Sequence, residues 1–296
     1  MAEAPFHSIL RADKTTGTAV SWALQSGPLL LILLGATQIG RAEVELLSDQ
    51  PPQAVFGGGK RAIVLQWRNA AAEPAQADLR FRLYRASAVS MLPIDEARSW
   101  KVLSLSPGQT TLESLEIDLP QVRGEAAFVV AWFAGERKLG TTSIHAYPEH
   151  LLQPLITLAG ERPIGLCDPE DRLSPAFKSV PSQVLKESED IVSTEAALII
   201  IAPMSSPNRP NGLATAVKRK AASGAAIIWI QPSPKRALER VLPTHLVREG
   251  SGLVVVTQAS LVNNFSNSPL AQLNLVSLAE LATGRVQLEL PTDPQP

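Results

Sequence analysis

The sequence predicts two domains: an all-β sandwich, followed by an α/β domain with a mainly parallel sheet. Apolar and polar residues alternate with a period of two over residues 44–147, which is typical of strands with one wet face. Two short apolar runs, AALIIIAP at residues 196–203 and AAIIWIQP at residues 225–232, bracket an amphipathic stretch. Each run is too short to span a membrane and is rich in β-branched residues. Each is therefore expected to be a strand buried on both faces of a parallel sheet.

Length and composition exclude several classes of protein. The 296 residues are enough for two domains that each bury a core. The net charge of −1 creates no global field toward nucleic acid or anionic lipid, so we expect no nucleic-acid partner. Cys167 is the only cysteine, which excludes an intramolecular disulfide and any multi-cysteine metal site. The 4 histidines are scattered, so we expect no metal and no cofactor.

The first 42 residues are expected to direct the chain to a membrane. Arg11 and Lys14 precede a stretch that carries no charge until Arg41, and its most apolar part is LLLILL at residues 29–34. A basic start followed by a short apolar core is typical of a secretory signal peptide. Residues 1–42 are therefore predicted to be a signal peptide or a membrane anchor.

Small residues near the end of this segment place the expected cleavage after Ala42. Cleavage there predicts an exported protein, periplasmic or extracellular. The alternative is an uncleaved anchor in the cytoplasmic membrane over residues 19–40, because about 20 apolar residues suffice to span a bilayer. A buried cytosolic helix is the third interpretation. We expect contact with a membrane only through this segment, if it is uncleaved.

Residues 43–148 are expected to form an immunoglobulin-like β-sandwich, because about seven strands in about a hundred residues are typical of that architecture. The three glycines at residues 57–59 are expected to form a hairpin turn. The single cysteine rules out the inter-sheet disulfide of antibody domains, so Trp67 and Trp132 are expected to fill the core. The expected strands are residues 44–47, 63–68, 79–84, 100–105, 112–119, 126–133 and 141–147.

After a connector at residues 149–162, the α/β domain is expected to occupy residues 163–286. A helix is predicted between the two apolar runs, with Gly224 as its C-terminal cap. An antiparallel hairpin is predicted at the edge of the sheet, and a last helix begins after Ser268 as N-cap. The expected elements are strands at residues 163–167, 183–186, 196–202, 225–230, 244–248 and 253–258, helices at residues 173–179, 211–223, 235–240 and 269–283, and a disordered tail at residues 287–296.

The strand-helix-strand segment ALIIIAP…AVKRKAASGAAIIWIQP, with the order of elements around it, resembles the flavodoxin-like fold of class I glutamine amidotransferase-like domains. It is also similar to non-catalytic versions of that fold beside immunoglobulin-like sandwiches in exported bacterial proteins. Catalytic members carry a cysteine or serine on a tight turn after a central strand. Here Gln231 and Pro232 follow the best candidate strand, and His245 has no acidic partner nearby. The resemblance therefore implies a non-catalytic domain.

Ligands of parallel sheets bind beyond the carboxyl ends of the strands. The two apolar runs are followed there by prolines, Met204 and Gln231, none of which is a nucleophile, a metal ligand or a general base. The loop at residues 203–210 precedes a helix, and its serines can donate hydrogen bonds to an anion. Its three prolines favour ordinary turn and capping chemistry instead. The ligand-binding candidates are Asp168, Met204, Ser205, Ser206 and Gln231.

Cys167 ends the first strand of the second domain and is the only candidate catalytic residue. A thiol at the carboxyl end of a strand could be a nucleophile. The alternative is a small buried apolar side chain, because cysteine is among the most buried residue types. Asp168 directly after it is explained as a cap or turn residue for the helix ahead, or as a ligand contact.

Two further groups in the first domain suggest binding faces. Arg80, Arg82 and Arg85, with Tyr84, are expected to form a basic and partly aromatic strand face that could bind carbohydrate or protein. Trp100 is a second position at which a glycan could stack. Arginines on the wet side of a sheet also simply maintain solubility. His145 and His150 have no spacing that suits a metal pair, and surface or domain-interface positions are expected for them.

Taken together, these patterns predict a non-catalytic exported binding or scaffold protein of the cell envelope, with a protein or carbohydrate partner. The first alternative is a thiol-dependent hydrolase or amidotransferase-like enzyme that uses Cys167. The second alternative is a carbohydrate-binding accessory protein. Fold does not dictate function, so the site itself has to discriminate among the three.

Overall fold

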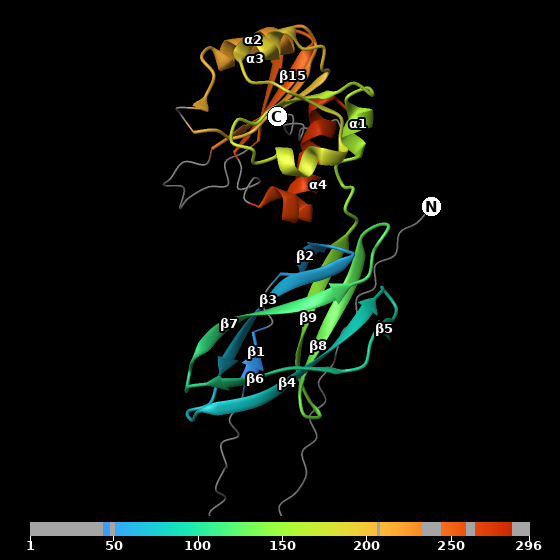
Figure 1. Ribbon diagram of the computed structural model, residues 1–296, viewed down its shortest axis with the longest axis vertical. Helices are drawn as coiled ribbons and strands as arrows, with labels where there is room; N and C mark the ends of the chain where they lie inside the picture. The colour runs from blue at the N-terminus through green and yellow to red at the C-terminus, as the bar shows by residue number, and fades with distance from the viewer. Residues whose placement is uncertain (1–43, 48–50, 206–207, 233–243, 259–263, 286–296) are drawn as a thin grey trace, which may run out of the picture. The chain divides into compact units, whose positions relative to one another are not determined.

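The computed structural model describes residues 44–47, 51–205, 208–232, 244–258 and 264–285 (Figure 1). The predicted signal peptide or anchor, its cleavage position at Ala42, the basic helix at residues 235–240 and the tail at residues 287–296 lie outside the described residues. Within the described residues, no helix is both long enough and apolar enough to cross a membrane.

The first part of the described chain, up to Tyr147, consists of two sheets (Figure 1). Their strands are β1 (Val44–Leu46), β2 (Gln53–Phe56), β3 (Gly59–Asn69), β4 (Ala75–Ala86), β5 (Met91–Pro93), β6 (Arg98–Leu105), β7 (Thr110–Leu119), β8 (Ala126–Ala134) and β9 (Arg137–Tyr147). One sheet has the order β1-β3-β7. The other has the order β2-β9-β8-β4-β5, with β6 also paired to β4.

A shared core lies between these two sheets, because the apolar residues of the period-two pattern face inward from both. Leu65 of β3 and Leu79 of β4 are among them, and both are buried. Trp67 and Trp132 are fully buried and their rings meet edge to face with 5.3 Å between centroids. The prediction that these two indoles fill the core is confirmed.

The prediction of a hairpin turn at residues 57–59 is wrong. β2 pairs in parallel with β9, whereas β3 pairs with β1 and β7, so the glycines carry the chain from one sheet to the other. The Gly57 N–H donates to the Tyr147 carbonyl at 2.8 Å, and the Gly58 N–H donates to the Pro120 carbonyl at 3.1 Å. Gly58 has a φ of 80°, which disfavours any other residue there.

The second part of the chain is built on one six-stranded sheet. Its strands are β10 (Ile164–Cys167), β11 (Ser182–Val184), β12 (Leu198–Ile201), β13 (Ala226–Gln231), β14 (His245–Glu249) and β15 (Gly252–Gln258). The order is β11-β10-β12-β13-β15-β14, and every neighbouring pair is parallel except β14-β15. The antiparallel hairpin at the edge of the sheet is therefore confirmed.

Helices cover both faces of this sheet. They are α1 (Pro154–Leu158), the 3₁₀ helix η1 (Ser174–Ser179), α2 (Ser188–Ser193), α3 (Leu213–Ala222), the 3₁₀ helix η3 (Phe265–Asn267) and α4 (Pro269–Ala282). Residues of α2 and α3 pack with Ile199 and Ile227 on one face. Residues of α1, η1 and α4 pack with Ile200 and Ile228 on the other. The expectation that β12 and β13 are buried on both faces is thus confirmed.

The helical layers are sparse, which is a departure from the predicted architecture. Strands make up 45% of the residues that the structure describes. Among the described helices, only α3 and α4 are longer than six residues. The expected helix at residues 173–179 is the 3₁₀ helix η1, and α2 was not predicted. The expected N-cap of α4 is confirmed, because the Ser268 hydroxyl accepts from the Ala271 N–H at 3.3 Å.

Candidate functional site

The carboxyl ends of the central parallel strands lie at one edge of the second sheet. Cys167 of β10 is in register with Ile201 of β12, which is in register with Trp229 of β13. The chain leaves β10 toward β11 and leaves β12 toward β13, in opposite directions along the sheet. Such a reversal of strand order is where open α/β sheets bind ligands. A ligand site is therefore expected among the loops after β10, β12 and β13.

A carboxylate, Glu170, connects the loop after β10 to the loop after β12. Its Oε1 accepts from the Ser205 N–H at 2.7 Å, from the Ser205 hydroxyl at 2.5 Å and from the Asn208 side-chain amide at 3.2 Å. Its Oε2 forms an ion pair with Nη2 of Arg172 at 2.6 Å. These donors, those of Ser205 first, lower the pKa of Glu170 to about 2. Ser205 is thus occupied by an internal carboxylate.

Replacing Glu170 with Gln is expected to reduce stability at neutral pH by about 1 kcal/mol, as for a good partly exposed ion pair. The folded state lowers the pKa of Glu170, so its stabilisation is fully present above the ordinary carboxyl pKa of about 4.3 and is lost as the pH falls toward 2. Urea unfolding of both proteins at pH 7 and near pH 2 measures this. The difference in unfolding free energy should become much smaller near pH 2, where Glu170 is partly protonated in the folded state.

The matched control is Glu116→Gln, which removes a charge from an exposed position on β7. It should leave the dependence of stability on pH almost as it is in the wild type. An equal effect of both substitutions would mean that the bonds of Glu170 to Ser205 and Asn208 contribute nothing specific.

Asp168 is used as a local cap. Its carboxylate accepts from the backbone N–H groups of Arg172, Leu173 and Ser174 at 2.7–3.0 Å and from the Ser174 hydroxyl at 2.8 Å. Four donors satisfy most of the lone pairs of a carboxylate. The side chain therefore holds the turn before η1, which is the capping role considered for it from the sequence.

Cys167 has the environment of a core residue. Its side chain is fully buried in the cluster that α2 and α3 form with the sheet. Burial, and then the charges of Asp168 and Asp190, raise the pKa of the Cys167 thiol to about 11. At neutral pH this thiol is protonated and shielded from solvent, whereas a nucleophilic cysteine needs an accessible thiolate. The geometry therefore disfavours Cys167 as a nucleophile.

A pocket of about 270 Å³ lies at the carboxyl ends of β12 and β13, and we call it the β12–β13 pocket. It brings together two of the residues singled out from the sequence, Met204 and Gln231. Ser206 lies outside the described residues, and neither Asp168 nor Ser205 lines the pocket. The lining residues are Ala202, Met204, Arg209, Leu213, Trp229, Ile230, Gln231 and Pro232.

Arg209 and Trp229 form the polar and aromatic part of this pocket. The guanidinium carbon of Arg209 lies 5.3 Å from the centre of the Trp229 ring, a cation–π distance. Trp229 is half-buried, whereas the aliphatic residues beside it in β13 are buried. One feature of the sequence indicated an aromatic group at this position, namely a single indole at the carboxyl end of an otherwise aliphatic strand. The sequence did not show that Arg209 contacts this indole.

The predicted basic face of β4 is only partly assembled. Strand alternation places Arg80, Arg82 and Tyr84 on the outer face, and Arg85 on the side of the core-facing residues at the exposed end of the strand. The prediction of one face with three arginines is therefore wrong. Arg82 lies over the Tyr84 ring at 5.6 Å and donates to the Asp95 carbonyl at 2.9 Å.

Trp100 and His145 each have a structural contact, and His150 is exposed at the surface, as expected. The Trp100 ring lies 5.2 Å from that of Trp132 and packs against the core, which leaves less of it for stacking on a glycan. His145 Nδ1 is 2.6 Å from Glu125 Oε1. Within the described part of the chain, no group of three or more His, Cys, Asp or Glu side chains could hold a metal ion.

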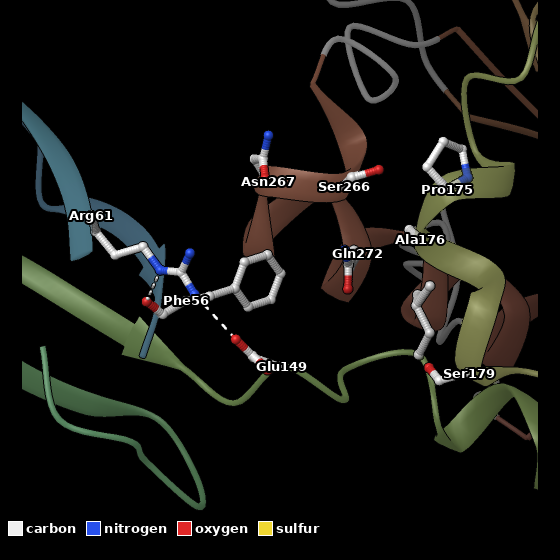
Figure 2. A pocket seen from close by; sticks show the side chains of 10 residues that line it. Phe56, Arg61, Glu149, Pro175, Ala176, Ser179, Ser266, Asn267 and Gln272 are labelled. Atoms are coloured by element: carbon white, nitrogen blue, oxygen red, sulfur yellow. Dashed lines mark hydrogen bonds and ion pairs between the residues drawn. The ribbon is translucent and has the colours of Figure 1, made fainter. Parts of the chain in front are cut away.

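A second cavity, of about 220 Å³, is lined by Arg61 and Glu149 among others (Figure 2). Arg61 Nε donates to the Phe56 carbonyl at 2.9 Å, and its Nη2 contacts the Gly58 carbonyl at 3.1 Å and Glu149 Oε1 at 3.2 Å. The guanidinium is thus committed to holding the glycine turn and the connector. This leaves the cavity with little unpaired charge to attract a ligand.

Comparisons with known proteins identify no family. No protein-family model matches the chain, and no curated protein matches it. A solved alkylpurine DNA glycosylase of Pseudomonas fluorescens, bound to DNA with an abasic site analog, is 16% identical with a TM-score of 0.28, over 36% of this chain and 31% of that one. A β-glucosidase from Listeria innocua in complex with gluconolactone is 15% identical with a TM-score of 0.27, over 36% of this chain and 16% of that one.

A β-glucosidase from Erythrobacter marinus gives similar values: 17% identity and a TM-score of 0.28, over 36% of this chain and 15% of that one. The chain therefore spans less than a third of the length of each of these three structures. Likenesses of this size point to neither a family nor an activity.

Proposed function

We propose that this chain is a non-catalytic, exported binding or scaffold protein of the cell envelope, and that its second part binds a small ligand in the β12–β13 pocket. One observation carries the proposal: the pocket lies beyond the carboxyl ends of two central parallel strands, and an indole and a guanidinium meet in it. Apolar pockets with a few convergent polar groups at this edge of a sheet are the usual ligand sites of such folds.

The chemistry of the lining favours binding over catalysis. The polar side chains among the described lining residues are the Arg209 guanidinium, the Gln231 amide and the Trp229 indole. A guanidinium stays protonated throughout the physiological range, and an amide does not exchange protons as an acid or base. These groups orient a ligand by hydrogen bonds and stacking. The thiol-dependent alternative has less support, because the Cys167 thiol is buried and protonated.

The architecture that we propose is an immunoglobulin-like sandwich followed by a flavodoxin-like, glutamine amidotransferase-like domain. Two sheets around one core support the first, and the parallel order β11-β10-β12-β13 supports the second. Export is proposed on the uncharged apolar segment within residues 1–42. N-terminal sequencing of protein recovered from the envelope tests it, with Glu43 expected as the first residue. A protein or carbohydrate partner at the envelope completes this proposal.

Filling the pocket is expected to abolish ligand binding. The variant Gln231→Trp places an indole in the pocket from a half-exposed position, so the core is left intact. Saturation-transfer NMR with a set of small aromatic, aliphatic and sugar compounds identifies those that bind the wild-type chain. Compounds that occupy the β12–β13 pocket should lose their signal with Gln231→Trp.

The matched control is Gln76→Trp, which introduces the same side chain at an exposed position of β4. It should bind the same compounds as the wild type. The proposal of a ligand site fails if no compound binds the wild type, or if every compound that binds it still binds Gln231→Trp.

A further inference from the structure

We infer that the β12–β13 pocket takes a small carboxylic acid with a flat apolar body, whose carboxylate is held by Arg209 and whose body lies against Trp229. This inference rests on the proposed function, namely that the pocket is a ligand site, and adds the chemical class of the ligand. It is supported by the charge of Arg209, the positive end of α3, the apolar residues that line the pocket and the volume of the pocket.

The first observation is the charge of Arg209 at the rim of the pocket. No ion pair found in the described part of the chain includes Arg209, whereas Arg61, Arg98 and Arg172 each pair with a carboxylate. Its guanidinium carbon lies 5.3 Å from the centre of the Trp229 ring. A guanidinium held over a ring keeps its N–H groups directed outward in its own plane. That fork matches the two oxygens of a carboxylate.

The second observation is the amino terminus of α3, which is independent of Arg209. Leu213, the first residue of this ten-residue helix, lines the pocket. The N-cap is Gly212, which has no side chain to accept from the first N–H groups, and the first turn holds no acidic residue. The positive end of the helix is therefore not neutralised by its own cap. Two positive features beside one pocket favour an anion.

The rest of the lining favours an apolar body over a second charge. Met204, Leu213 and Ile230 are buried residues that line the pocket together with the Trp229 ring. A thioether and an indole both make favourable contacts with flat rings. A doubly charged phosphate would lose much more of its hydration against these apolar side chains than a single carboxylate would. A single carboxylate matches the single cation.

The volume sets the size of the ligand. A pocket of about 270 Å³ holds about nine waters at roughly 30 Å³ each, so it suits a molecule of about nine non-hydrogen atoms. This is enough room for one ring with a carboxylate. Glu170 does not cancel the positive charge at the rim, because it is paired with Arg172 at 2.6 Å.

The test uses benzoate as the probe and benzamide as its neutral match, with calorimetric titration of the full chain. Benzoate is expected to bind the wild type at least about tenfold more tightly than benzamide does. Arg209→Gln should weaken benzoate binding by at least about tenfold and change benzamide binding little. Arg209→Lys keeps the charge without the planar fork, and its affinity should lie between those of the wild type and Arg209→Gln.

The control is Arg219→Gln, an exposed arginine in the last turn of α3, which should bind benzoate as the wild type does. Thermal melting verifies that each variant is folded. If benzamide binds as tightly as benzoate, or if Arg209→Gln binds benzoate normally, the inference about the carboxylate is wrong and the pocket remains a ligand site. If uncharged compounds bind the pocket and benzoate does not, the same conclusion holds. Failure of every compound, charged or neutral, contradicts the proposed function itself.

Discussion

Trp132→Ala is expected to lower the free energy of unfolding by about 3–5 kcal/mol, the range for removing a large aromatic side chain from a core. The Trp132 ring is fully buried, and its centre lies 5.2–5.8 Å from those of Trp67, Phe81 and Trp100. Its loss leaves a cavity between the two sheets that the surrounding structure fills only in part. Urea unfolding followed by far-UV circular dichroism measures the change without relying on indole fluorescence.

The conservative pair Trp132→Phe and Trp67→Phe provides the control. The Trp132 Nε1 donates to the Thr142 hydroxyl at 3.1 Å, whereas the Trp67 Nε1 is buried with no hydrogen-bond partner among the described residues. Removing a satisfied N–H costs stability, and removing an unsatisfied one removes a desolvation penalty. Trp132→Phe should therefore be the more destabilising of the two. The reverse order would mean that the two indoles are not distinguished by their hydrogen bonding.

Gly252→Ala is expected to destabilise the second part of the chain by about 3 kcal/mol or more. Overpacked sites typically lose about 1–3 kcal/mol, and this site is at the upper end of that range. Gly252 begins β15, and a Cβ there would lie 2.2 Å from the Ala221 carbonyl oxygen and 2.5 Å from that of Ala225. Both obstacles are backbone atoms, one in the last turn of α3 and the other just before β13, so no side-chain rotation relieves the clash. Thermal melting of the full chain measures the effect.

Gly124→Ala is the matched control, because a Cβ at Gly124 meets nothing within 4 Å and its φ is not in the left-handed region. This variant is expected to be neutral, or slightly stabilised through the reduced freedom of the unfolded chain. Equal melting temperatures for both variants would show that α3 and β15 separate easily, against the close approach seen in the structure.

Regular elements of this fold were predictable from the sequence because their cause is local. The alternation in β3 and β4 is visible in the residues themselves, and so is the serine N-cap of α4. β2 and β5 were missed because they are only four and three residues long and carry no full alternation. The glycines at residues 57–59 have the same turn chemistry in a hairpin as in a crossing between sheets, so only the pairing of β2 with β9 distinguishes the two.

The position of the candidate site was predictable from the sequence, but several of its residues were not. The rule that ligands bind at the carboxyl ends of parallel strands led to Met204 and Gln231, which do line one pocket. Glu170 was missed because its partner Ser205 is 35 residues further along the chain. The contact of Arg209 with Trp229 was missed for the same reason, since a loop residue and a strand residue far apart in sequence give no shared pattern.

The crossing at residues 57–59 also sets the order in which the first part of the chain can be completed. Among the described strands, β2 lies at the edge of its sheet and pairs with β9 alone, Gln53 opposite Ile144 and Phe56 opposite Tyr147. Such non-local pairing gives a high contact order and slow folding. During synthesis the ribosome must therefore release the chain as far as Tyr147 before β2 has its partner strand, and until then the backbone groups of β2 that pair with β9 are open to other chains.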